Sequence, residues 1–118
     1  MINRLNEDEM FDLTYRACLA AVGAGFPHLP LSAIIDPPHP WFDAAFARQI
    51  VLHLMIARFD IPRRRVCLEH GRNRATVLRA MRVVDERLDT PAFEAHYRKI
   101  AAHADELLAD PERLTEAA

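Results

Sequence analysis

The sequence predicts an all-α protein with about five helices. Apolar residues recur at the three- and four-residue spacing of a helix in several separate segments, and no segment has the pattern of a strand. Five of the eight prolines fall in one connector, residues 26–41, which leaves the rest of the chain open to long helices. A chain of 118 residues, 51% of them hydrophobic, suits one compact domain built from these helices.

The first helix is expected over residues 6–22. Asn6 can cap it, and acidic residues fill its first turn, where the helix dipole favours negative charge. The glycines that follow are expected to end it. Its apolar stripe has helical spacing and consists of Phe11, Tyr15, Cys18 and Val22. The connector then allows little helix beyond a turn near residues 31–35.

Residues 43–59 form the most apolar stretch and predict the central helix, because a helix that is apolar all round is buried. Pro62 suits the first position of a short helix over residues 63–70. Val66 is expected to point inward, with Leu68 as a second inward candidate. Gly71 can adopt the backbone conformation that a tight turn requires.

The next helix is expected over residues 73–88, with Asn73 as its cap. Its arginines spread over the side opposite its apolar stripe. That inward stripe consists of Val77, Met81, Val84 and Leu88. Thr90 caps a last helix that begins at Pro91. The apolar stripe of this last helix consists of Phe93, Tyr97, Ile100, Ala104 and Leu107.

Positive charge is concentrated in the middle of the chain. Nine arginines and four acidic residues lie between Arg58 and Arg87, which gives this segment a net charge of about +5. The rest of the chain has six basic and thirteen acidic residues, or about −7. The binding of a polyanion requires a basic region of this kind. The alternative is that the arginines are present as good helix formers on solvated faces.

A short helix, a glycine turn and a longer helix with a basic outer face form the pattern of a helix-turn-helix. In such motifs the second helix enters the major groove, and arginine can bind either guanine or a phosphate. The first helix crosses the DNA backbone, which suits the arginines at positions 63–65. The candidate DNA-binding residues are Arg63, Arg64, Arg65, Arg72, Asn73, Arg74, Thr76, Arg79 and Arg82.

Two blocks, "ARQIVLHL" (47–54) and "GRNRATVLRAMRVV" (71–84), resemble the C-terminal DNA-binding domain of the bacterial replication initiator DnaA. That family shows an "ARQIAMYL"-like helix and a "GRDHTTVLHAIRKI"-like recognition helix at nearly the same separation. The resemblance covers roughly residues 44–109. It implies a Trp-repressor-like helical fold and binding of double-stranded DNA. We therefore expect an N-terminal helix and connector over residues 1–42, the DnaA-like domain over 43–110, and a tail over 111–118.

The chain also departs from this family. In the family, the residues Asp-His-Thr-Thr of the recognition helix contact bases and phosphates. Here residues 73–76 take their places and only Thr76 is unchanged, so the base preference should differ. Phe46 takes the approximate place of an arginine that reaches into the minor groove in the family. There is no phosphate-binding loop and no room for an ATPase domain, so the resemblance implies a stand-alone regulator or accessory of replication or transcription.

Other chemistry has little support in the sequence. Cys67 and His70 could form half of a zinc site, but no second pair has ligand spacing, and no catalytic pair or nucleotide cradle is evident. We therefore expect no enzymatic activity, metal or cofactor. Two cysteines and the absence of a signal peptide or membrane span predict a reduced, cytoplasmic protein.

Two hypotheses on function remain from the sequence. In the first, the chain binds double-stranded DNA, and its N-terminal helix either covers the domain or pairs two copies. In the second, the fold has lost DNA binding and serves as a protein-interaction adaptor that docks through the N-terminal part and Trp41. The sequence favours Trp41 as a plug over the core, with the docking anchor as its alternative role. The basic face of the helix over residues 73–88 discriminates between the two hypotheses. An exposed basic face favours the DNA-binding hypothesis, and a face neutralised by the acidic N-terminal helix favours the adaptor hypothesis.

Overall fold

The structure is a computed structural model that describes residues 4–38, 41–70 and 73–117, and this part of the chain contains helices and no strand. The all-α prediction is confirmed, and five of the helices have seven residues or more, as expected. In chain order the elements are α1 (Arg4–Gly25), α2 (Leu31–Ile35), α3 (Phe42–His53), the π-helical turn η1 (Leu54–Arg58), α4 (Arg63–His70), α5 (Arg74–Arg87), α6 (Pro91–Ala109) and α7 (Glu112–Ala117).

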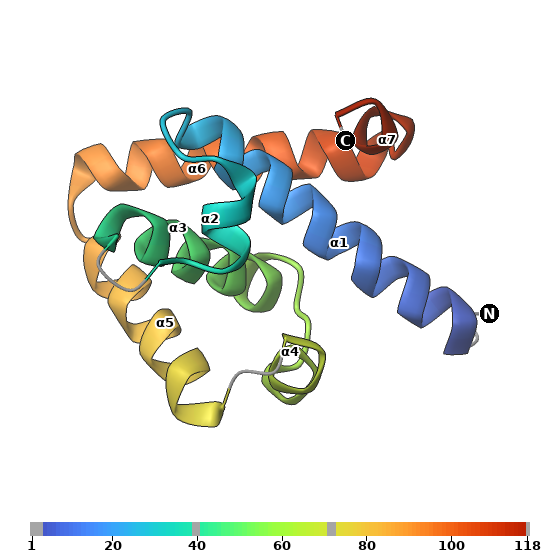
Figure 1. Ribbon diagram of the computed structural model, residues 1–118, viewed down its shortest axis with the longest axis horizontal. Helices are drawn as coiled ribbons and strands as arrows, with labels where there is room; N and C mark the ends of the chain where they lie inside the picture. Colours follow the sequence, from blue (N-terminus) through green and yellow to red (C-terminus); the bar gives the residue numbers. More distant parts are fainter. Residues whose placement is uncertain (1–3, 39–40, 71–72, 118) are drawn as a thin grey trace.

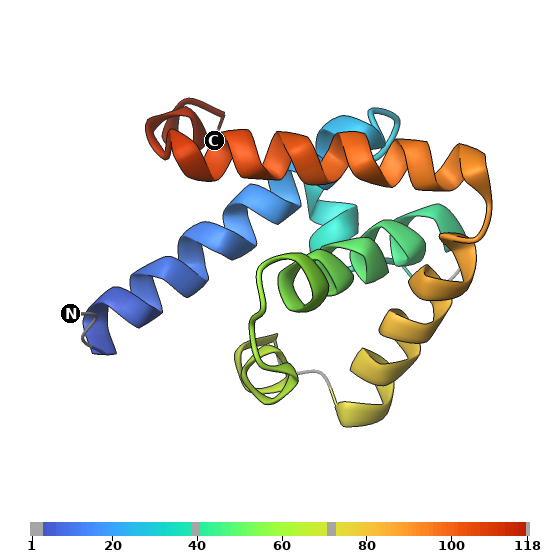
Figure 2. The ribbon, with the colours of Figure 1, turned by 180° about the vertical axis from the view of Figure 1, so that it is seen from behind.

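The helices are arranged around α3, which lies in the middle of the molecule (Figure 1). α1 and α6 pack on each other along one side of it, and α5 packs on α3 from the other (Figure 2). α4 is seen almost along its axis in Figure 1 while α5 runs across the page, so these two helices are steeply inclined. Together α4 and α5 form the end of the molecule that lies opposite α6.

α1 is longer than the sequence predicts and covers the domain. It continues through Gly23 and ends at Gly25, so the first glycine does not stop the helix. Gly25 is needed for close packing, because a Cβ atom there would lie 2.8 Å from Cδ1 of Ile100 on α6. The inward residues of α1 include Cys18 and Val22, both fully buried. The N-terminal helix is therefore an integral layer of the fold.

The central apolar segment is not one regular helix. α3 gives way after His53 to η1, in which the amide of Phe59 donates to the carbonyl of Leu54 over 3.1 Å. Asp60 then takes a left-handed backbone conformation with φ of 56°, which aspartate tolerates better than most residues. The segment is otherwise as expected, because the residues from Ile50 to Met55 are all buried.

His53 joins three helices inside the core. Its side chain is 3% exposed, and its two ring nitrogens lie 2.6 Å from the hydroxyl of Tyr97 on α6 and 2.7 Å from a carboxylate oxygen of Asp85 on α5. A carboxylate can only accept, so Nε2 donates to Asp85, and in the neutral ring Nδ1 accepts from Tyr97. Burial raises the pKa of Tyr97 above its usual value, so its hydroxyl stays protonated and can donate the hydrogen bond to Nδ1 of His53.

The connector and the C-terminal segment also pack on the domain. The short turn expected near residues 31–35 is α2, whose Ala33 and Ile34 are buried. The segment assigned to a tail, residues 111–118, contains α7, and Leu114 in it is only 4% exposed. α7 contacts α1, so the end of the described chain is part of the same core.

Candidate nucleic-acid interface

The start of α5 is held by its own cap. Oδ1 of Asn73 accepts hydrogen bonds from the amide of Thr76 over 2.8 Å and from the hydroxyl of Thr76 over 2.9 Å. The expected cap is therefore confirmed. Gly71 and Arg72, which the sequence assigns to the turn and to the DNA contacts, lie outside the described residues. The first described residues of α5 are exposed.

α5 separates its apolar and basic side chains as the sequence predicts. Val77, Met81 and Val84 are buried, and Leu88 just beyond the helix is half-buried. Arg74, Arg79 and Arg82 are all exposed. Arg74, Leu78 and Arg82 are spaced four residues apart and thus follow one stripe along the exposed side of the helix. The basic face of α5 is open to a ligand.

The three arginines that open α4 do not act as one group. Arg63 and Arg64 are exposed, whereas Arg65 turns toward α1. Nη2 of Arg65 lies 2.6 Å from a carboxylate oxygen of Asp8, and its guanidinium stands over the Phe11 ring at 4.6 Å from the centroid. Both partners are on α1. Arg65 is therefore neutralised within the protein and does not join the other candidate residues.

The remaining candidate arginines of this face have no carboxylate partner among the described residues. Within the described residues, no carboxylate oxygen lies within 4 Å of the five exposed arginines, namely Arg63, Arg64, Arg74, Arg79 and Arg82. Four other described arginines do pair with carboxylates, namely Arg16, Arg58, Arg65 and Arg98. The α4–α5 face thus carries positive charge that the protein does not neutralise.

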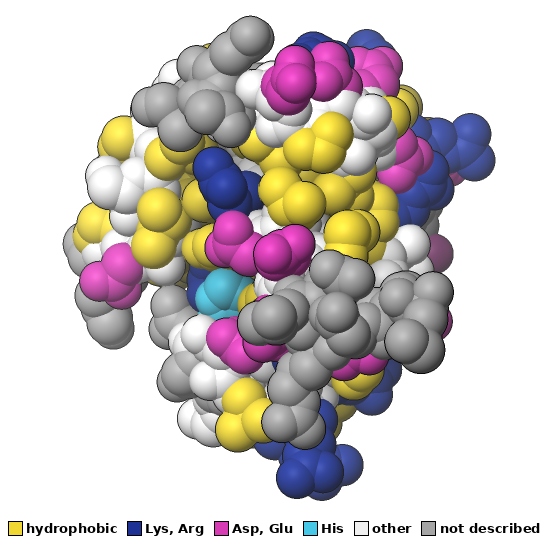
Figure 3. Space-filling view, turned by 90° about the vertical axis from the view of Figure 1, so that its right-hand side faces the viewer, with side chains coloured by type: hydrophobic (Ala, Val, Ile, Leu, Met, Phe, Trp, Pro, Cys, Tyr) yellow, Lys and Arg dark blue, Asp and Glu magenta, His cyan; other side chains and the backbone are white. Residues whose placement is uncertain are grey.

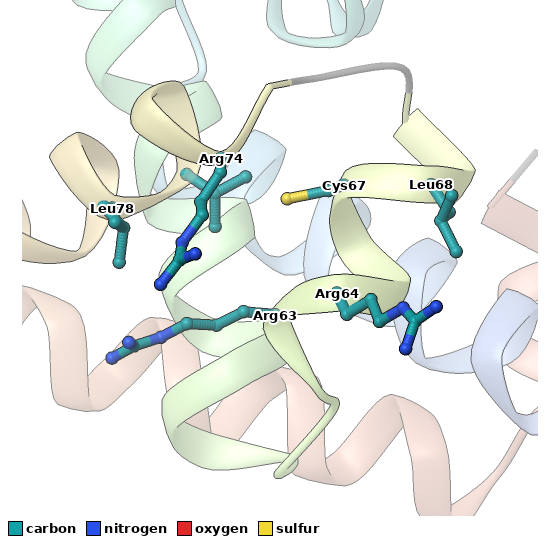
Figure 4. A pocket seen from close by; sticks show the side chains of 7 residues that line it. Arg63, Arg64, Cys67, Leu68, Arg74 and Leu78 are labelled. Atoms are coloured by element: carbon teal, nitrogen blue, oxygen red, sulfur yellow. The ribbon is translucent and has the colours of Figure 1, made fainter.

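A groove of about 440 Å³ separates α4 from α5. Figure 4 shows Arg63 and Arg74 extending to the same side of the gap with Leu78 beside them, while the sulfur of Cys67 points across it toward α5. Leu68 is 75% exposed, so the expectation that it points inward is wrong. The short helix buries Val66 and leaves Leu68 on its outer side. We call this groove the α4–α5 groove; its lining residues are Arg63, Arg64, Cys67, Leu68, Arg74, Val77 and Leu78.

The Cys67 and His70 pair does not gather further metal ligands. The ring of His70 packs on Tyr15, with centroids 4.3 Å apart, and lies near Phe11. Over the described ranges no three side chains of histidine, cysteine, aspartate or glutamate come together as a metal site. His70 instead helps to join α4 to α1.

Two features of the structure, one on the surface and one in the interior, are not predicted by the sequence. Phe42, the residue after half-buried Trp41, is 84% exposed. Arg48 is only 6% exposed; among the residues that the structure describes, its side chain donates one hydrogen bond, to the hydroxyl of Tyr15 over 3.3 Å, and its Nε has no partner. Figure 3 shows hydrophobic, acidic and basic side chains mixed together on the side of the molecule where α1 begins. An arginine inside a helix looks exposed in sequence, so the burial of Arg48 has no local signal.

No protein-family model, curated protein or solved structure matches this chain. Among the described residues, no helix combines the length and the hydropathy that crossing a membrane requires. The assignment of a function therefore depends on the residues of the chain itself.

Proposed function

We propose that the protein binds double-stranded DNA in a sequence-specific manner through α4 and α5, as a regulator or accessory of replication or transcription. The carrying observation is that five exposed candidate arginines on these two helices have no carboxylate partner among the described residues. Uncompensated guanidinium groups on one face attract a polyanion, and arginine binds both phosphates and guanine edges. The sequence likeness of residues 71–84 to the DnaA recognition helix supports the same proposal.

The arrangement of the helices suggests separate tasks for the arginines. Arg74 lies in the first turn of α5, beside the capped end that would enter the major groove, so it is suited to base contacts together with Thr76. Arg79 and Arg82 lie further along the exposed side and suit phosphates. Arg63 and Arg64 at the start of α4 suit the flanking backbone.

A second candidate function is that of a protein-interaction adaptor that has lost DNA binding. It is favoured by Phe42, whose ring is 84% exposed at the start of α3 next to Trp41. An exposed aromatic side chain is suited to anchor a partner. The ion pair of Arg65 with Asp8 also removes one positive charge from the DNA-facing set, as the adaptor hypothesis expects.

The test is selection from a pool of random duplexes, followed by affinity measurements on the enriched sequence. The proposal predicts enrichment of a defined site and a loss of discrimination at one or two positions in Arg74→Ala, by about 5- to 150-fold. Arg98→Ala on α6 is the matched control, because Arg98 is an exposed arginine that already pairs with Glu94. Failure of the wild-type protein to enrich any duplex, or an equal loss in both variants, would refute the proposal.

A further inference from the structure

The α4–α5 groove has the size of a small-molecule site. Its volume of about 440 Å³ falls within the range of pockets that hold drug-sized ligands, and such pockets combine apolar walls with a few polar groups. A duplex uses the outer surface of a recognition helix and has no need of a groove beside it. This feature of the fold therefore goes beyond the proposed DNA binding and does not depend on it.

The walls of the groove are apolar and partly open to solvent. Leu78 on α5 is 38% exposed and Val77 is buried, whereas Leu68 extends from the far side of α4, away from α5 (Figure 4). Cys67 is half-buried and directs its sulfur into the gap (Figure 4). An exposed leucine loses contact with water when an apolar group fills the groove beside it. The apolar part of a ligand would be stabilised here.

The charged residues of the groove are all of one sign. Arg63 and Arg74 come from different helices and extend to the same side of the gap (Figure 4). None of the lining residues is acidic, and no described carboxylate lies within 4 Å of either guanidinium. A planar guanidinium binds a carboxylate through two parallel hydrogen bonds. The complementary head group is therefore an oxyanion that accepts paired hydrogen bonds, of which a carboxylate is the simplest.

We propose that the α4–α5 groove binds a small alkyl carboxylate. The carboxylate lies between the guanidinium groups of Arg63 and Arg74, and the alkyl chain lies along Val77, Leu78 and Cys67. Binding of the carboxylate stands apart from DNA binding, but its consequence for DNA rests on the proposed function: because the proposed DNA contacts also use Arg74, the ligand and a duplex would compete for this residue. An alkyl carboxylate would then act as an effector that releases DNA.

Cys67 provides a reporter of occupancy that needs no substitution and no DNA. Its thiol lines the groove, whereas Cys18 is completely buried and burial raises the pKa of its thiol, so a thiol reagent distinguishes the two. The experiment follows alkylation of Cys67 by neutral iodoacetamide, by mass spectrometry, in the presence of sodium decanoate. Decyltrimethylammonium has the same chain with the opposite charge, and acetate has the same head without the chain.

The expected result is saturable protection of Cys67 by decanoate, with little protection by either control compound at equal concentration. Shortening the chain from decanoate should weaken the apparent affinity by up to about fourfold per CH₂ group. Protection by decyltrimethylammonium equal to that by decanoate would overturn the role of the arginines. An alkylation rate that decanoate leaves unchanged would overturn the proposal as a whole.

Substitutions of exposed residues test whether decanoate binds in the α4–α5 groove, and they leave the core unchanged. Leu78→Gln should weaken protection about fivefold, since it removes one apolar wall, and the double variant Arg63→Gln/Arg74→Gln should abolish the preference for decanoate over decyltrimethylammonium. Met10→Gln is the control, because Met10 is a 51% exposed apolar residue on α1, away from the groove. Equal protection in Leu78→Gln and Met10→Gln would contradict the site. Failure of DNA binding alone would leave these results untouched.

Discussion

Replacing His53 by alanine should destabilise the protein strongly, because this buried side chain joins α3 to α5 and α6. It removes two short hydrogen bonds, to the hydroxyl of Tyr97 at 2.6 Å and to the carboxylate of Asp85 at 2.7 Å. The two partners differ in their surroundings. Tyr97 is half-buried, whereas the side chain of Asp85 is 64% exposed and can be hydrated again after the change.

The size of the effect follows from these contacts. Each lost hydrogen bond contributes about 1 kcal/mol, and the Tyr97 hydroxyl, left without a partner, costs a further 1–2 kcal/mol or so. The total loss in the free energy of unfolding is then about 3–4 kcal/mol for His53→Ala. Tyr97→Phe loses one bond and should cost about 1 kcal/mol, while Asp85→Asn should cost about 1 kcal/mol or less because Asp85 is exposed.

Urea unfolding followed by circular dichroism measures these differences. In a double-mutant cycle, His53→Ala and Tyr97→Phe should show a coupling of about 2–3 kcal/mol. Thermal unfolding of His53→Ala should occur about 8–15 °C below that of the wild type. A loss below 1 kcal/mol for His53→Ala, together with no coupling in the cycle, would refute the role of His53 as the link between these helices.

Three further substitutions test other contacts. Asn73→Ala removes the cap of α5 and should lower stability by about 1 kcal/mol in urea unfolding, because the amide of Thr76 loses its partner. Arg65→Ala breaks the contacts with Asp8 and Phe11 on α1 and should cost about 1 kcal/mol or less, with no change in affinity for duplex DNA by fluorescence anisotropy. Arg48→Met replaces a buried guanidinium that has no carboxylate partner among the described residues, and should leave the midpoint of thermal unfolding unchanged or raise it.

Each of these expectations has a contrary result. A fully stable Asn73→Ala would mean that the cap does not hold the start of α5. A loss of DNA affinity in Arg65→Ala as large as that in Arg74→Ala would place Arg65 on the DNA-facing surface after all. A strong destabilisation by Arg48→Met would mean that the buried guanidinium gains more from Tyr15 than it loses by burial.

The helices and the outward face of α5 could be predicted from the sequence because their causes are local. The spacing of Val77, Met81 and Val84 fixes which side of α5 is buried, and this places Arg74 and Arg82 on the outside. Asn73 could likewise be predicted as a cap, because asparagine is a preferred N-cap residue and it stands directly before the helix. These features need no knowledge of which helix packs against which.

The remaining features depend on contacts between distant segments. Arg65 meets Asp8 across 57 positions of sequence, so its neighbours in the chain do not distinguish it from Arg63 or Arg64. Leu68 points outward because the short α4 rests on Val66, which only the packing of α4 against its neighbours decides. The π-helical turn η1 has no residue signal, since Leu54 and Met55 suit an α-helix equally well.

The most direct test of DNA binding is its dependence on salt. Affinity for a duplex is measured between 50 and 200 mM salt for the wild type, Arg74→Ala and Arg65→Ala, because log affinity falls with log salt by about 0.9 per neutralised phosphate. The proposed interface predicts a steep slope, reduced by about one in Arg74→Ala and unchanged in Arg65→Ala. Micromolar protein that leaves duplex DNA unbound even at 50 mM salt would contradict it.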